Sequence, residues 1–345
     1  MSDDDLLLPP SEPTAPERPA PAWAKKSPPK SKAANRPKPK ITAQRYSAPN
    51  DPHQHSQKIA ENVMDAWYQS FGGSSIDVPL GTVGALTLLR TPEGTNADLA
   101  NWILNLQPRE LPQLFKEIYL GHWLSRPDLI NRAIRLHDWA WNPNPDEQQL
   151  RAVHAVTNKA INTGLFDLTS HADPYMRSDA DVLSPLLTGL RHKSDKKWRG
   201  EYHTPPCVTD LMARMLVDTD FGGPDKAIRE PAVGSGTMFR SAAQRLRELQ
   251  LDPHDYHWYG NDIDALSAAC AALNTITWDL GPRAFIGCAD SIALEDGGHA
   301  KTLAEARDAC AQRDQYMETA SAIVASRRAF ALIDQLTSGK ENTAA

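Results

Sequence analysis

The stretch EPAVGSGTM, residues 230–238, decides the fold of this 345-residue chain. A candidate strand, Ala227–Arg229, precedes it, and a strongly helical pattern, Met238–Leu249, follows it. Ligands bind at such strand-to-helix turns on parallel sheets. Gly234 and Gly236 allow positive φ angles and a close approach of a ligand to the backbone. The stretch therefore predicts a ligand site at the end of a strand.

Three classes of ligand compete for this turn. A P-loop needs Gly-Lys-Ser/Thr, whereas Thr237 and Met238 follow the second glycine, which disfavours a nucleoside triphosphate. A dinucleotide fingerprint needs a third glycine where Phe239 stands, and the carboxylate of Glu230 would repel a pyrophosphate. The same carboxylate suits a cation. The turn therefore favours S-adenosylmethionine, which carries a sulfonium and an ammonium group.

Two further acids follow the next candidate strands. The strand His257–Tyr259 leads to Asp262, which lies 26 residues beyond Gly236, near the usual offset of ribose-binding acids. The strand Ala284–Gly287 leads to Asp290. This carboxylate has two possible roles, to accept a hydrogen bond from the adenine amine or to cap a following helix.

The periodicity of the chain divides it into four segments. Residues 1–55 are rich in proline and lysine, which predicts a disordered tail. Residues 56–178 have apolar side chains at helical spacing, which predicts an α-helical domain. Residues 179–300 alternate helices with strands, as in an S-adenosylmethionine-binding α/β domain with a partial, Rossmann-like parallel sheet. Residues 301–345 are predicted to form a helical segment of one long or two shorter amphipathic helices.

The composition limits the classes of function. Between Ala20 and Asn50 the tail has eight Lys or Arg and no acid, so it is either a phosphate-binding arm or a solubilising leader. The net charge of −6 argues against a surface that binds nucleic acid over its whole extent. The four cysteines form no CxxC pair, so we expect neither a metal site nor disulfides. The acidic start and the lack of long apolar runs predict a cytoplasmic protein without a membrane segment.

Residues 181–292 resemble the N6-adenine DNA methyltransferases of type I restriction-modification systems. In addition to the glycine turn and the two acids, Gly200-Glu201-Tyr202-His203-Thr204-Pro205 resembles the family motif that lies over the cofactor, with His203 in place of the usual aromatic residue. Thr204 is expected to cap a helix whose first turn contains Pro205. The predicted cofactor-binding residues are Tyr202, His203, Thr204, Pro205, Glu230, Ala232, Gly234, Gly236, Asp262, Ile263 and Asp290.

The catalytic motif of this family is absent from the chain. Such enzymes use Asn or Asp followed by Pro-Pro and an aromatic residue, whose acceptors bind the target amine of an extruded base. No proline follows Pro282, and the upstream Asp173-Pro174-Tyr175 lacks the second proline. We therefore predict no catalytic residues here. The resemblance implies a subunit truncated before this motif, with a partner chain that supplies catalysis and target recognition on double-stranded DNA.

Two other interpretations remain at this point. The chain is either a non-catalytic relative that serves as an interaction or regulatory protein, or an active methyltransferase that uses other groups on another substrate. An interaction protein would bind its partners whether or not Asp262 is present.

Overall fold

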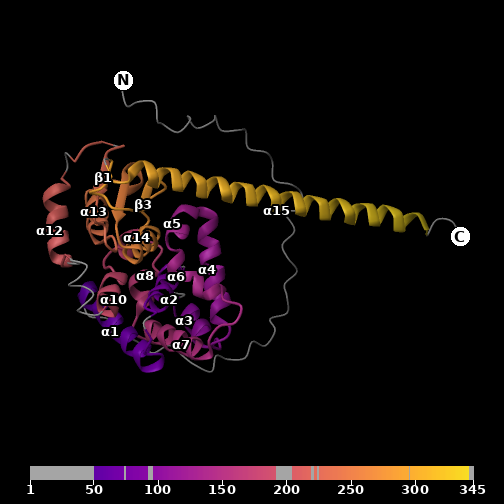
Figure 1. Cartoon of the computed structure of the whole chain (residues 1–345), viewed down its shortest axis with the longest axis horizontal. Coiled ribbons are helices and arrows are strands. Elements are labelled where there is room, and N and C mark those ends of the chain that lie inside the picture. Colours follow the sequence, from indigo (N-terminus) through magenta and orange to yellow (C-terminus); the bar gives the residue numbers. More distant parts are fainter. Residues whose placement is uncertain are drawn as a thin grey trace, which may run out of the picture. The chain divides into compact units, whose positions relative to one another are not determined.

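The computed structural model of the chain (Figure 1) describes most residues between Asn50 and Glu341. The described ranges are 50–73, 75–91, 96–191, 204–218, 221–223, 225–294 and 296–341. Residues 1–49 of the predicted tail lie outside these ranges. Among the described helices, none has both the length and the apolar composition that crossing a bilayer requires.

Helices make up the first part of the described chain. They are α1 (Pro52–Ser70), α2 (Asp77–Thr87), α3 (Asn96–Leu104), α4 (Leu111–Ser125), α5 (Pro127–Arg132), α6 (Ile134–His137), the 3-10 helix η3 (Asp138–Trp141), α7 (Glu147–Asn162), α8 (Leu165–Thr169), α9 (Pro174–Arg177) and α10 (Leu183–Leu190). Asp51 caps α1 by accepting a hydrogen bond from the His53 N–H at 2.8 Å. Ile59, Val63 and Trp67 lie four residues apart and are fully buried, which fixes the face that α1 presents to the core.

The second part contains a three-stranded parallel sheet in the order β1-β2-β3. Its elements are α12 (Pro206–Leu216), β1 (Ala227–Glu230), α13 (Thr237–Glu248), the 3-10 helix η4 (Pro253–Asp255), β2 (His257–Asp262), α14 (Ala265–Thr277) and β3 (Ala284–Cys288). This sheet confirms the predicted partial α/β fold after a helical region. Each predicted strand is present, and β1 and β2 run far enough to include Glu230 and Asp262.

The two faces of the sheet differ in burial. Trp258, Ala284 and Ile286 are buried, and Trp258 packs edge-on against Phe239 of α13. Side chains alternate between the two faces along a strand, so Tyr259 and Phe285 lie on the opposite face. There, the rings of Tyr259 and Phe285 stack with centroids 5.7 Å apart and are only partly buried. The sheet thus has one complete core face.

Helix α14 joins the sheet to the helical region. It contacts β2 and β3 on one side and α2, α5, α6 and α10 on the other. Three arginines bind the carbonyl groups at its C-terminal end: Arg90 and Arg177 donate to Thr277 O at 3.2 and 2.8 Å, and Arg247 donates to Trp278 O at 2.6 Å. These cations satisfy carbonyls that the helix itself leaves unpaired.

The described chain ends in one long helix, α15 (His299–Glu341). Its first turns pack on β3 and α5, where Thr302, Ala306 and Ala309 are buried. Every residue from 314 to 331 is exposed. The predicted helical segment is therefore a single helix, and only its beginning belongs to the core.

Candidate functional site

The stretch of residues 230–238 forms a tight turn with two glycines at positive φ. Gly234 has φ +58° and Gly236 has φ +98°. The Gly236 N–H donates to Val233 O at 2.8 Å, which closes the turn before α13. A Cβ on Gly236 would lie 3.1 Å from the ring of Trp278, whereas a Cβ on Gly234 would meet no atom within 4 Å. Packing thus requires Gly236, while the backbone at Gly234 has open space beside it.

Asp262 joins this turn to the end of β2. Its Oδ2 accepts a hydrogen bond from the Gly234 N–H at 2.8 Å, and its Oδ1 accepts one from the Asp264 N–H at 2.8 Å. The structure thus brings the predicted ribose-binding acid into contact with the predicted glycine motif. We call residues 230–238 together with Asp262 the glycine corner.

Glu230 is the second acid of the glycine corner. Its Oε1 accepts a hydrogen bond from the Ala232 N–H at 3.2 Å. Burial raises the pKa of Glu230, the Ala232 N–H lowers it, and the negative charge of Asp262 raises it again. Two carboxylates at the carboxyl ends of neighbouring strands repel each other, so a cation between them would be stabilised. The electrostatics of the corner suit a positively charged ligand.

Asp181 supports the corner from inside the protein, and the sequence analysis missed this role. Its buried carboxylate accepts hydrogen bonds from Ser235 Oγ at 2.6 Å, Thr237 Oγ1 at 2.8 Å and Asn274 Nδ2 at 2.9 Å. It thereby links the turn to α14. The only signal in the sequence was a pair of hydroxyl residues in the turn, and their partner lies 54 residues before Ser235.

Asp290 and Ile263 flank the corner on the loops after β3 and β2. Asp290 Oδ1 accepts hydrogen bonds from the N–H groups of Ile292 at 3.0 Å and Ala293 at 3.1 Å. Asp290 therefore caps a turn and not a helix, because α15 begins only at His299. The Ser291 hydroxyl donates to Pro231 O at 3.0 Å, which ties this loop to the glycine corner. Ile263 is 71% exposed.

The predicted Thr-Pro helix start is wrong by one residue. Helix α12 begins at Pro206, its N-cap position is Pro205 with φ −56° and ψ 141°, and no side chain caps it. A proline excludes its preceding residue from the helical conformation, so Pro206 keeps Pro205 extended and Thr204 outside the cap position. Tyr202 and His203 lie outside the described residues. Of the upstream acids, Asp173 caps α9 by accepting from the Tyr175 N–H at 2.9 Å.

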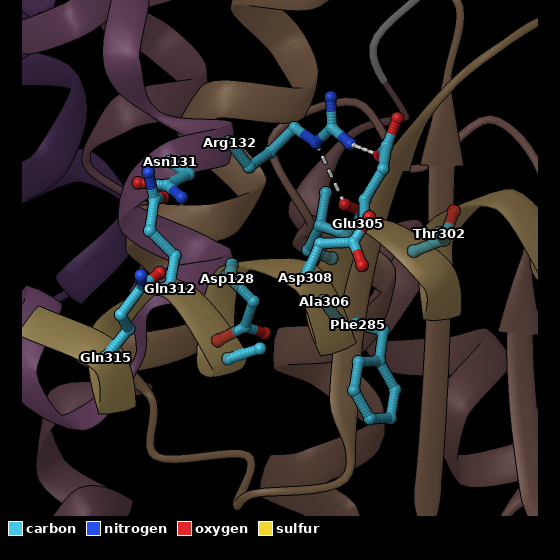
Figure 2. A pocket seen from close by; sticks show the side chains of 13 residues that line it. Asp128, Asn131, Arg132, Phe285, Thr302, Glu305, Ala306, Asp308, Gln312 and Gln315 are labelled. Atoms are coloured by element: carbon cyan, nitrogen blue, oxygen red, sulfur yellow. Dashed lines mark hydrogen bonds and ion pairs between the residues drawn. The ribbon is translucent and has the colours of Figure 1, made fainter.

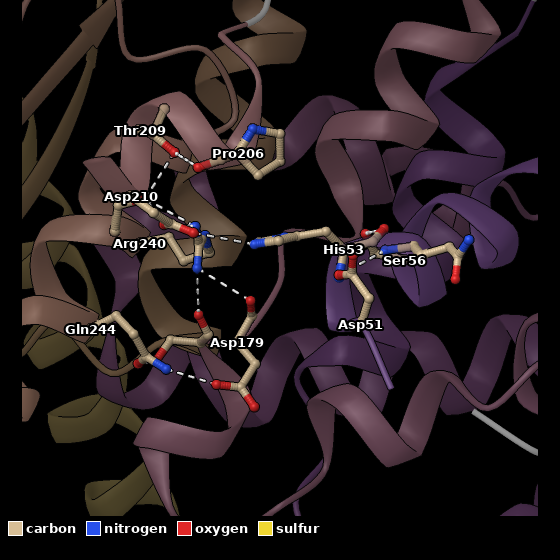
Figure 3. Close-up of polar contacts among 12 residues, drawn as sticks. Asp51, His53, Ser56, Asp179, Pro206, Thr209, Asp210, Arg240 and Gln244 are labelled. Carbon is tan, nitrogen blue, oxygen red and sulfur yellow. Dashed lines mark hydrogen bonds and ion pairs between the residues drawn. The ribbon is translucent and has the colours of Figure 1, made fainter. Parts of the chain in front are cut away.

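A partly buried polar cluster fastens α12 to its neighbours (Figure 3), and no pattern in the sequence indicated it. Arg240 of α13 is 2% exposed and forms an ion pair with Asp210 of α12, while its Nη1 donates to Ser178 O at 3.1 Å. Asp210 also accepts from Ser241 Oγ at 2.6 Å and lies 3.3 Å from His53 Nε2 of α1. We call these five residues the polar junction.

The titration of Asp210 reflects these partners. Burial raises its pKa, but the hydrogen bond from His53 and the charge of Arg240 outweigh burial, so the pKa of this carboxyl lies well below its usual range. Asp210 is therefore a charged structural group that holds α12 in place.

A cavity of about 640 Å³ lies away from the glycine corner, between α5, β3 and the start of α15 (Figure 2). Arg132 crosses it, pairing with Glu305 and donating from Nε to Ile286 O at 3.0 Å. The residues that line it are Asp128, Asn131, Arg132, Phe285, Ile286, Thr302, Glu305, Ala306, Asp308, Ala309, Ala311, Gln312 and Gln315. None of them was predicted to bind the cofactor.

Comparison with known proteins places the glycine corner in a family. Residues 185–303 match the family model described as N-6 DNA Methylase. This segment, about a third of the chain, is similar to the N-6 DNA methylases. The methylase segment contains all three strands, the glycine corner, Asp290 and the start of α15. The predicted family is thus confirmed.

A solved structure similar to this chain is that of the type I restriction-modification system methyltransferase subunit from Streptococcus thermophilus. The two chains are 15% identical, with a TM-score of 0.43 over 70% of this chain and 60% of that subunit. This chain thus covers 60% of the length of that subunit. The search of curated proteins found no match.

Proposed function

We propose that this chain supplies the S-adenosylmethionine-binding part of an adenine-specific DNA methyltransferase of the restriction-modification type. The observation that carries this proposal is the hydrogen bond from the Gly234 N–H to Asp262, which joins the two cofactor motifs in one corner beside Glu230. The match of residues 185–303 to the methylase family supports it.

The residues of the corner suit this cofactor. The open space beside Gly234 admits the methionyl part close to the backbone, and Glu230 attracts its positive charge. Each oxygen of Asp262 has a second lone pair with which to accept a hydrogen bond from a ribose hydroxyl. Ile263 and Asp290 are proposed to contact the adenine. When bound, the cofactor supplies the methyl group.

Another polypeptide is proposed to supply catalysis and target recognition. No proline follows Pro282, so the Pro-Pro motif that would hold the target amine has no place in the later part of this sequence. Within the described ranges, no strand pairs with the outer edge of β1, where Ala227 and Arg229 are exposed. An open strand edge can accept a further strand. The double-stranded DNA substrate would then bind to the completed enzyme.

Thermal unfolding with and without S-adenosylmethionine tests the proposal. The wild-type melting temperature should rise with cofactor concentration, because a ligand that binds the folded state stabilises it. Asp262→Ala should remove the rise, and Asp262→Asn, which keeps an acceptor for the Gly234 N–H, should reduce it. Asp65→Ala, at an exposed position on α1, is the matched control and should keep the full rise. A wild-type melting curve that does not respond to the cofactor would contradict the cofactor site.

A methylation assay tests the need for a partner. Transfer of labelled methyl groups to adenine in DNA should require a second polypeptide that contains Asn-Pro-Pro-Phe or a close variant. Methyl transfer by this chain alone would show that its own residues include the catalytic group. Cofactor binding without transfer in the presence of any such partner would instead favour an interaction or regulatory protein.

A further inference from the structure

The exposed part of α15 has an apolar stripe. Tyr316, Ile323 and Phe330 are seven residues apart, and they are 59%, 50% and 68% exposed. Met317 and Val324, each 47% exposed, lie beside them. A repeat of seven residues keeps side chains on one face of a helix and is the spacing of coiled-coil seams. Within the described residues, nothing covers this stripe beyond Tyr316.

The stripe continues into an apolar groove on the helical region. A hollow of about 600 Å³ is lined by residues of α4, α5, α6 and η3 and by Tyr316 of α15. The Tyr316 ring packs edge-on against Trp123 with ring centroids 6.0 Å apart. On the same helix as Trp123, Leu120 and Leu124 are 47% and 50% exposed. Tyr316 thus belongs to both surfaces and makes them continuous.

The seam residues of α15 are complementary to the seam residues of a second, antiparallel copy of the same helix. The stripe defines one set of seam positions at Tyr316, Ile323 and Phe330, and the alternating set is Arg313, Ala320 and Arg327. When two such helices run antiparallel, one set faces the other. Arg313 then meets Phe330, Tyr316 meets Arg327 and Ala320 meets Ile323, and every contact occurs twice. This reciprocity is the property of a two-fold symmetric interface.

We propose that the α15 stripe binds a second copy of this chain, with the two helices antiparallel. The contact extends over the 18 residues from Arg313 to Phe330, or about 25 Å of helix. Each Arg327 lies on the Tyr316 ring of the other copy, where a guanidinium is attracted to the aromatic face. The end of one helix then reaches the apolar groove of the other copy, beside Leu120 and Leu124.

The charges of the stripe favour this orientation over a parallel one. A parallel pair in register would place Arg327 against Arg327 and Arg313 against Arg313 within the seam. Like charges at short distance in a partly dry seam are repulsive. The antiparallel pair replaces these two arginine–arginine contacts with four arginine–aromatic contacts.

Sedimentation velocity of the full chain over a range of concentrations tests the proposal. The wild type should dimerise, and Ile323→Glu should raise the dissociation constant at least about 30-fold, because it places a charge in the middle of the seam. Ala325→Glu adds the same charge about 200° around the helix and should leave the dimer unchanged. Circular dichroism melting of both variants checks that the fold is intact.

A second variant tests the orientation. Arg327→Gln should weaken an antiparallel dimer, because the contact with Tyr316 is lost, whereas it should tighten a parallel dimer by removing repulsion between arginines. A wild type that remains monomeric at its highest soluble concentration would overturn the proposal. So would a dimer that Ile323→Glu leaves unchanged. A tighter dimer of Arg327→Gln would overturn the antiparallel arrangement.

Discussion

A sequence motif predicted the glycine corner, whereas no sequence motif indicated the polar junction. The corner is built from one continuous stretch and one acid at the end of the next strand. The junction collects His53, Asp210, Arg240 and Ser241 from α1, α12 and α13, together with Ser178. In both regions, partly buried carboxylates accept hydrogen bonds from the protein. The corner leaves open space beside Gly234, whereas the junction joins α12 to α1 and α13 and serves stability.

Removal of Arg240 should have the largest effect on stability. Arg240→Ala leaves the Asp210 carboxylate and the Ser178 carbonyl without their cation, so we expect a loss of about 3 kcal/mol in the free energy of unfolding. Urea unfolding measures it. Arg214→Ala, at an exposed arginine 3.4 Å from Glu248, is the control and should cost less than about 0.5 kcal/mol. Equal losses of unfolding free energy in the two variants would mean that the junction stabilises the fold no more than an exposed ion pair does.

Substitution of the two corner glycines should separate packing from binding. Gly236→Ala combines a φ of +98° with a Cβ contact of 3.1 Å to Trp278, and should cost about 2–3 kcal/mol in unfolding free energy. Gly234→Ala has no such contact and should cost about 1 kcal/mol. Urea unfolding of both variants gives the comparison. A larger loss at Gly234 than at Gly236 would contradict the geometry described for the corner.

For the stability that each substitution costs, Gly234→Ala should weaken cofactor binding more than Gly236→Ala. Gly234→Ala places a methyl group in the space proposed for the cofactor, so we expect an affinity at least about 10-fold weaker, or about 1.4 kcal/mol. Calorimetric titration with S-adenosylmethionine measures it on folded protein. Gly121→Ala, where a Cβ would also meet no atom within 4 Å, is the matched control on α4 and should bind normally.

The smallest expected effect is a pH dependence of stability from Asp210. Its pKa in the folded protein lies below the unfolded value of about 3.9, so its contribution to stability is complete above the unfolded pKa and is lost as the pH falls from that value through the lower folded pKa. Unfolding free energy measured between pH 5 and pH 3 should therefore fall less steeply in Asp210→Asn than in the wild type. Identical slopes would exclude Asp210 from the acid sensitivity of the fold.

The sequence predicted the parts of the site whose geometry is local. The structure has the three strands and the turn at the predicted positions, with Glu230 and Asp262 at the ends of strands. These features could be predicted because they depend on residues that are neighbours in the sequence. The helix cap predicted at Thr204 was wrong, because a second proline, Pro206, governs the conformation of Pro205. The helix cap proposed as one alternative for Asp290 was also wrong, since a turn follows it.

The sequence alone thus predicted a family, a partial parallel sheet and a corner suited to a cationic ligand, because each prediction follows from the chemistry and order of adjacent residues. Only the tertiary structure showed that Asp181 supports this corner, that Arg240 holds α12, and that Arg90, Arg177 and Arg247 converge on the end of α14. These contacts join residues distant in the chain. Their partners depend on how helices pack, and no local pattern specifies which buried charge will meet which carbonyl or carboxylate.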